Sequence, residues 1–120
     1  MKYDLIAPTS MGIRLSPLER QPVGITRLYT MYATSAESNV LNVSAALGLK
    51  AHVLTAFVKG SPIADFIRGE LRRRSITYEG PEVAQGGPWG YRHQINIADA
   101  GFGVRGPRVH NDRAGEVGRL

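Results

Sequence analysis

The residues of this sequence best suited to bind a polar ligand lie between Thr34 and Asn39. Thr34 and Glu37 match a capping box, in which a hydroxyl and a carboxylate hydrogen-bond the free amides at a helix start. Asn39 can both donate and accept hydrogen bonds, and a helix start favours polar or anionic groups. A small polar molecule could therefore dock here. Capping alone also explains Thr34 and Glu37, and on periodicity it is the simpler interpretation.

A second candidate, residues 101–106, reads Gly-Phe-Gly-Val-Arg-Gly and satisfies the string G-x-G-x-x-G. In a dinucleotide-binding fold such glycines face a pyrophosphate at a helix start. Here a proline and a strand-like segment follow where the helix should begin, so we interpret the string as a hairpin tip. The sequence contains no G-x-x-x-x-G-K-[ST] phosphate loop, and its three histidines lack metal-ligand spacing. We expect this chain to bind no cofactor and no metal.

Basic residues dominate the charge, because 15 lysines and arginines face 10 acidic residues and leave a net charge of +5. This excess suits an anionic partner. The triplet Arg72 to Arg74 follows an apolar helical pattern, and cations in a last helical turn are each favoured by about 0.3–1 kcal/mol. We prefer this structural interpretation to a nucleic-acid surface, for which a steep salt dependence of binding would be required. The sequence shows no recognition-helix or RNA-binding aromatic motif, so we expect no nucleic-acid partner.

The composition is that of one globular domain, since 120 residues with 42% hydrophobic side chains can bury a core. There is no cysteine, which suits a reducing compartment. The first eight residues are too short an apolar run for a secretory signal, and no stretch is long enough to cross a bilayer. We expect a cytoplasmic protein without a membrane partner.

Hydrophobic periodicity predicts strands that alternate with helices. One helix begins near Thr34, carries Val40, Val43 and Leu47 at helical spacing and ends at Gly48, and a second begins at Ser61-Pro62. Short apolar or alternating runs predict the strands, at residues 3–7, 11–16, 24–33, 51–58, 76–79, 91–97 and 108–113. The last two are expected to pair as a hairpin. This order favours an α/β fold with a mainly parallel sheet, in which the strands with polar faces form a small lid.

Separated motifs of the chain resemble ribokinase-type (PfkB) carbohydrate kinases. The stretch Ala36-Glu37-Ser38-Asn39-Val40, followed by Ala46 to Ala51, is similar to the family's Gly-Gly-Ala-Glu-x-Asn-Val and Leu-Gly segment. Residues 12–17 and 61–64 look like an early strand and the next helix of the same proteins. The run 112–115, Asp-Arg-Ala-Gly, is similar to one typical of the 2-keto-3-deoxygluconate kinase branch.

The resemblance implies a Rossmann-like, ribokinase-like fold. Residues 1–120 would form a single N-terminal sugar-binding portion, with lid strands within 11–33 and 89–113. It also implies dimers made through the lid, and a truncated doubly wound sheet would itself favour self-association through an exposed edge. We therefore expect a homo-oligomer.

Four substrate-binding residues follow from the resemblance, position by position. Asn39 would hydrogen-bond sugar hydroxyls, Ser35 would occupy the place of a sugar-contacting glycine, and Tyr91 would line the pocket. Arg113 would hold a sugar-acid carboxylate, for which a guanidinium fork is well suited. The chain departs from the family where Thr34-Ser35 replaces a glycine pair and where Ala7-Pro8-Thr9 replaces the usual Gly-Glu near the first strand. In addition, Asn111 stands where several relatives have a pocket tyrosine.

The function implied is the sugar-binding half of an ATP-dependent carbohydrate kinase, with 2-keto-3-deoxygluconate or a related sugar acid as substrate. The family's Gly-Ala-Gly-Asp anion hole, catalytic aspartate and nucleotide pocket lie in a later half that this sequence lacks. ATP and Mg²⁺ are thus implied only for a full-length parent, no catalytic residue is assigned, and the chain alone is expected to be inactive. The alternative is a noncatalytic module that binds a sugar acid or serves in assembly.

Overall fold

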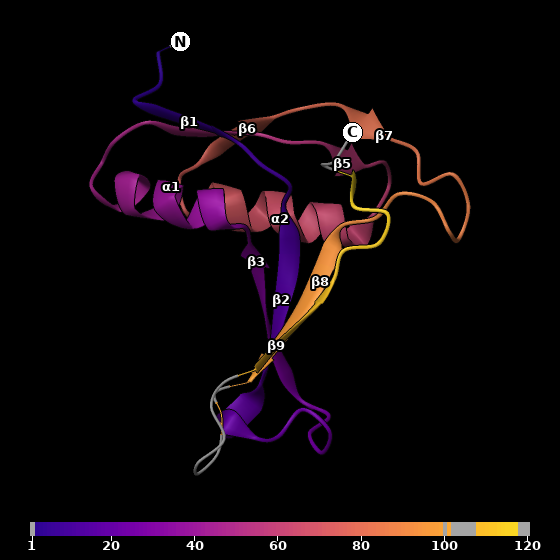
Figure 1. The fold of residues 1–120 in the computed structure, drawn as a ribbon. Coiled ribbons are helices and arrows are strands. Elements are labelled where there is room, and N and C mark those ends of the chain that lie inside the picture. Colours follow the sequence, from indigo (N-terminus) through magenta and orange to yellow (C-terminus); the bar gives the residue numbers. More distant parts are fainter. Residues whose placement is uncertain (1, 100, 102–107, 118–120) are drawn as a thin grey trace.

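The computed structural model describes residues 2–99, 101 and 108–117, and it has the predicted α/β architecture. Three parallel strands, β1 (Leu5–Pro8), β4 (Ala51–Leu54) and β6 (Thr77–Glu79), form one sheet in the order β1-β4-β6. The helices α1 (Ala36–Ala46) and α2 (Pro62–Arg73) lie on one side of this sheet (Figure 1). None of the helices in these residues is long and apolar enough to cross a membrane.

A second sheet extends away from the helices (Figure 1). Its strands are β2 (Gly12–Pro17), β3 (Tyr29–Thr34), β8 (Gln94–Asp99) and β9 (Arg108–Asp112), in the order β3-β2-β8-β9. The central pair β2-β8 is parallel, whereas the two outer pairs are antiparallel. The predicted hairpin of β8 and β9 is confirmed, but the G-x-G-x-x-G string at its tip falls, beyond Gly101, outside the described residues.

Most predicted strands differ from the observed ones by one to three residues at an end, and two differ more. The strand expected over 24–33 begins only at Tyr29, because the N–H groups of Ile25 and Thr26 donate to the Pro22 carbonyl and form a turn. The strand expected over 51–58 is divided into β4 and β5 (Phe57–Val58), and β5 pairs in parallel with β7 (Glu82–Val83). A short 3-10 helix, η1 (Leu18–Arg20), follows β2.

The N-cap of helix α1 lies one residue later than predicted. Ser35, not Thr34, is the N-cap, and its hydroxyl accepts from the Ser38 N–H at 3.0 Å. The Ser38 hydroxyl in turn accepts from the Ser35 N–H at 3.1 Å, so a serine takes the place expected for Glu37 in the capping box. Thr34 is instead the last residue of β3, where the ladder with β2 holds its backbone.

The apolar stripe predicted for α1 does not face the core. The side chains of Val40, Val43 and Leu47 are 61%, 63% and 74% exposed, whereas Leu41 is fully buried. The helix ends as predicted, because Gly48 adopts a left-handed conformation with φ of 83°.

Helix α2 follows its sequence signals closely. The Ser61 hydroxyl accepts from the N–H groups of Ile63 and Ala64, Pro62 occupies the first turn, and Ile67 and Leu71 are fully buried. These side chains join those of both sheets in one core, which contains Met11, Ile13, Ala33, Leu41, Ala51, Val53, Phe57, Ala64, Ile67, Leu71 and Ile76. The core therefore fixes the second sheet against α2.

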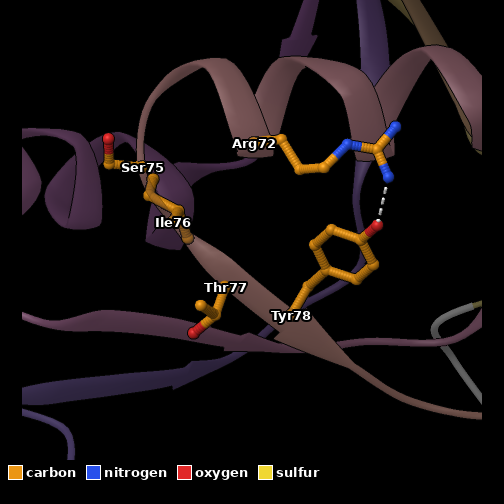
Figure 2. Close-up of a pocket in the computed structure, with 5 residues that line it drawn as sticks. All are labelled: Arg72, Ser75, Ile76, Thr77 and Tyr78. Carbon is orange, nitrogen blue, oxygen red and sulfur yellow. Dashed lines mark hydrogen bonds between the residues drawn. The ribbon is translucent and has the colours of Figure 1, made fainter.

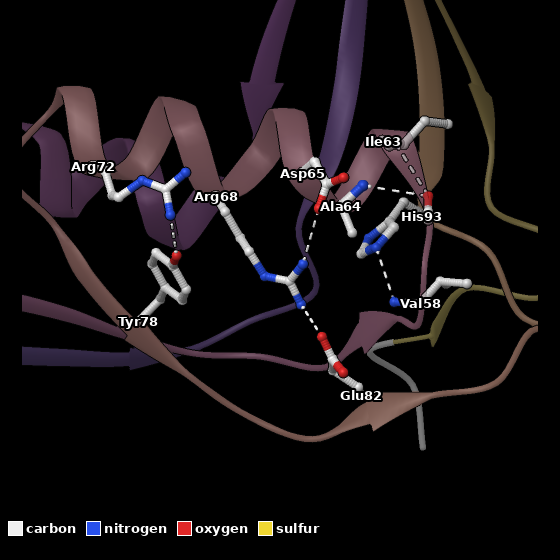
Figure 3. A network of polar contacts seen from close by, with 10 residues as sticks. Val58, Ile63, Ala64, Asp65, Arg68, Arg72, Tyr78, Glu82 and His93 are labelled. Atoms are coloured by element: carbon white, nitrogen blue, oxygen red, sulfur yellow. Dashed lines mark hydrogen bonds and ion pairs between the residues drawn. The ribbon is translucent and has the colours of Figure 1, made fainter.

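The arginines at the end of α2 make local structural contacts. The Arg72 Nη1 donates to the Tyr78 hydroxyl at 2.9 Å across a shallow hollow lined by residues 75–78 (Figure 2). Arg73 and Arg74 form ion pairs with Glu70 of the same helix. One turn earlier, Arg68 bridges Asp65 and Glu82 and so ties α2 to β7 (Figure 3). These contacts support the structural interpretation of the triplet.

Candidate functional site

A polar cavity of about 290 Å³ lies on one face of the second sheet. Strand pairing explains why polar residues meet there, because paired positions of neighbouring strands point to the same face. Arg14 pairs with Asn96, and Asn96 pairs with Asn111 on the other side. The opposite face carries Ile13 and Ile95, which pack in or against the core. The alternation of polar and apolar residues in β2 and β8 therefore builds a polar wall on an apolar support.

The start of α1 closes one side of this cavity, where Thr34, Ser35, Ala36 and Asn39 all line it. Asn39 is exposed, and its carboxamide is available to a ligand. The Ser35 hydroxyl already has hydrogen-bond partners, since it caps the helix and also donates to the Met11 Sδ at 3.4 Å. Ser35 therefore shapes the wall of the cavity more than it offers a free hydroxyl.

Two guanidinium groups supply positive charge to the cavity. Arg14 is half-buried, and its Nε donates to the Asn96 Oδ1 at 3.0 Å, which orients the group. Arg113 follows β9, is exposed, and has no side-chain hydrogen bond within the described part of the chain. A rigid fork of N–H donors at each position can bind a carboxylate through two parallel hydrogen bonds.

A second hollow, of about 270 Å³, adjoins the first and shares Ser35, Ala36, Gln94 and Arg113 with it. Hydroxyl and carboxylate groups line the rest of this second hollow, from Thr9, Ser10, Glu37 and Glu116. Glu37 accepts from the Thr9 hydroxyl at 2.8 Å, and Glu116 is only 8% exposed. The combined cavity is thus basic and amide-rich at one end and rich in hydrogen-bond acceptors at the other.

Three of the four sequence-predicted site residues, Ser35, Asn39 and Arg113, line this one cavity. Tyr91 does not line it, because it precedes β8 in a loop where its N–H donates to the Gln85 carbonyl at 2.8 Å. Sequence reasoning missed Arg14, Gln94 and Asn96. Their only signal was the polar alternation in two strands that lie about 80 residues apart along the chain.

His93 precedes Gln94 in the chain and is buried. Its Nδ1 donates to the Met11 carbonyl at 3.1 Å. Its Nε2 accepts from the Val58 N–H at 3.3 Å, the bond that Figure 3 shows. The ring is therefore neutral in the folded protein. Burial lowers the pKa of His93 below its ordinary value of about 6.5, chiefly because a charged ring would lose its hydration.

This histidine predicts a pH dependence of stability. Below pH 6.5 the unfolded chain binds a proton that folded His93 does not, so the free energy of unfolding falls as the pH decreases through this window, by at most about 1.4 kcal/mol per pH unit. Above pH 6.5 the stabilisation is complete. Urea unfolding between pH 5 and 8 measures the slope. His93→Gln is expected to reduce it. An equal slope in the wild-type chain and in H93Q would contradict the assignment.

No family model and no curated protein matches the sequence. Solved structures do match the fold of this chain. The 2-dehydro-3-deoxygluconokinase of Thermotoga maritima matches with a TM-score of 0.82 and 25% identity over 94% of this chain and 33% of its own. A putative 2-keto-3-deoxygluconate kinase of Enterococcus faecalis matches with a TM-score of 0.79 and 19% identity, over 95% of this chain and 32% of its own. A PfkB family carbohydrate kinase of Listeria grayi gives 0.80 and 21%, over 94% and 33%.

The chain therefore spans about a third of the length of these solved structures. The similarity covers more than nine-tenths of this chain, so it is not confined to one sheet or to one helix. Sequence motifs and three-dimensional structure thus agree. The chain has the ribokinase-like fold of the PfkB carbohydrate kinases, the family that its motifs resemble, over about a third of the length of those enzymes.

Proposed function

We propose that this chain forms the sugar-binding part of a carbohydrate kinase and binds 2-keto-3-deoxygluconate or a related sugar acid. The observation that carries the proposal is the shared cavity of Asn39 and Arg113, two residues 74 positions apart that the resemblance assigns to one sugar. Its volume of about 290 Å³ suits a small ligand. The solved structures with sugar-acid kinase names support the same ligand class.

The polarity of the cavity supports an acid over a neutral sugar. The carboxylate of the ligand would lie between Arg14 and Arg113, where charge-assisted hydrogen bonds are strong. Its hydroxyls would extend past Asn39 toward Glu37 and Glu116, whose carboxylates accept hydrogen bonds. A ligand with an anionic end and a hydroxyl-bearing end matches both halves of the combined cavity.

The proposal covers binding and assigns no step of phosphoryl transfer to this chain. Such transfer requires a cradle for the phosphates and a group positioned at the reacting hydroxyl. Within the described residues we identify no residues suited to hold ATP or Mg²⁺. We therefore expect the purified chain to bind the sugar acid without phosphorylating it.

Calorimetric titration tests this function. The 120-residue chain is expected to bind 2-keto-3-deoxygluconate with a Kd of about 1 mM or tighter, to bind gluconate comparably, and to bind glucose more weakly. Absence of binding to either acid at millimolar concentration would overturn the proposal. Incubation with ATP and Mg²⁺ is the second arm, and rapid formation of a sugar phosphate would show that the chain alone is catalytic.

A further inference from the structure

Gln94 is unusual among the residues of the cavity because its side chain is buried without being satisfied. It is 5% exposed, and its Oε1 has no hydrogen-bond partner within the described part of the chain. Buried polar atoms almost always have a partner, so each exception requires an explanation. Only two other side-chain atoms in these residues share this condition, and one of them, the Ser10 Oγ, lines the same hollow.

Gln94 lies where a ligand in either hollow would be next to it. The residue lines both hollows, together with Arg113 and the start of α1. It is paired with Gly12 across the β2-β8 ladder, and a Cβ atom at position 12 would lie 2.1 Å from the Gln94 Cγ. The Gln94 side chain therefore crosses over Gly12. Glycine is required at this position because a Cβ atom would also lie 2.6 Å from the Gln94 carbonyl oxygen.

We propose that Gln94 is a specificity-determining residue whose carboxamide hydrogen-bonds a hydroxyl of the bound sugar acid. The inference rests on the function proposed above and identifies a contact that the sequence motifs do not assign. In the free protein the unpaired Oε1 is buried and destabilising, so on binding the carboxamide would turn toward the hollow, where a ligand hydroxyl would supply the missing partner. A carboxamide can accept from or donate to a hydroxyl, so the contact holds whichever way the amide is turned.

The test compares Gln94→Met with a matched control, Gln85→Met, at an exposed glutamine that lines neither hollow. Methionine keeps nearly the shape of glutamine without its polar atoms. Without ligand, Q94M is expected to raise the Tm by about 3–8 °C, because an unpaired buried group has been removed. In calorimetry with 2-keto-3-deoxygluconate, the same variant is expected to weaken binding about 10-fold. Q85M should change neither quantity.

The possible outcomes separate this inference from the proposed function. If the wild-type chain binds the sugar acid and Q94M binds it equally well, the role of Gln94 is wrong and the proposed function stands. If the wild-type chain binds no sugar acid, the proposed function fails and the role of Gln94 fails with it. If Q94M does not fold, Gln94→Leu is the second variant. Failure of both to fold would show that the carboxamide has partners in the free protein, which also overturns the inference.

Discussion

Replacing Arg113 by glutamine is expected to weaken binding of 2-keto-3-deoxygluconate by about 100-fold and to change glucose binding little. The loss corresponds to about 2.7 kcal/mol, within the range for hydrogen bonds between charged groups. Arg113 lines both hollows and has no competing side-chain hydrogen bond within the described residues, so its donors are free for the ligand. Calorimetry of the two sugars with each protein measures the difference.

Two control variants define the role of the Arg113 guanidinium. Arg113→Lys keeps the charge but loses the fork, and an intermediate affinity is expected because an ammonium group cannot form two parallel hydrogen bonds. Arg73→Gln removes an exposed arginine at the end of α2 that lines neither hollow, and should leave affinity unchanged. If R113Q binds the acid as tightly as the wild-type chain, Arg113 does not hold the carboxylate.

The sequence predicted elements well where local signals act alone. Helix α2 is the clearest case, since a capping serine, a proline in the first turn and an apolar stripe all act within one segment. Helix α1 shows the limit of periodicity. The spacing of Val40 and Val43 predicts an apolar stripe but does not indicate whether that stripe faces the core, and in the structure it is exposed. The residue that packs, Leu41, is joined by fully buried Ser38, whose hydroxyl is satisfied by the capping box. A polar residue can therefore occupy the buried face when the helix start binds it.

Some residues of the candidate site could likewise be predicted from the sequence, and others could not. Asn39 and Arg113 were identified through motif resemblance, whereas Arg14, Gln94 and Asn96 have no local signal beyond strand alternation. Their meeting depends on the register between β2 and β8, in which residue 12 pairs with residue 94 across more than 80 positions of the chain. Long-range register is fixed by packing on the core and not by neighbouring residues. This explains why the polar wall of the cavity, which β2 and β8 provide, could be identified only in the structure.

Gly80→Ala is expected to destabilise the chain by about 3–5 kcal/mol. Gly80 follows β6 with a φ of 158°, and a Cβ atom there would lie 1.3 Å from the Thr55 carbonyl oxygen. Relaxation is blocked on both sides. The Thr55 N–H donates to the Glu79 carbonyl and the Phe57 N–H donates to the Pro81 carbonyl, each at 3.0 Å. The methyl group can be accommodated only if these bonds break and the segment of β4 and β5 separates from the segment of β6 and β7.

The matched control for Gly80 is Gly69 in α2, where an added Cβ would meet nothing within 4 Å. Gly69→Ala is expected to stabilise the chain by about 0.5–1 kcal/mol, because alanine restricts the unfolded chain and favours the helix. Urea unfolding followed by circular dichroism gives both values. A domain of this size has about 5–15 kcal/mol of stability, so G80A should lose a large share of it. If G80A unfolds at the same urea concentration as the wild-type chain, the backbone from Glu79 to Pro81 is not held against Thr55. The carboxyl ends of the parallel strands, which border the second hollow at Thr9 and Ser10, would then be free to move.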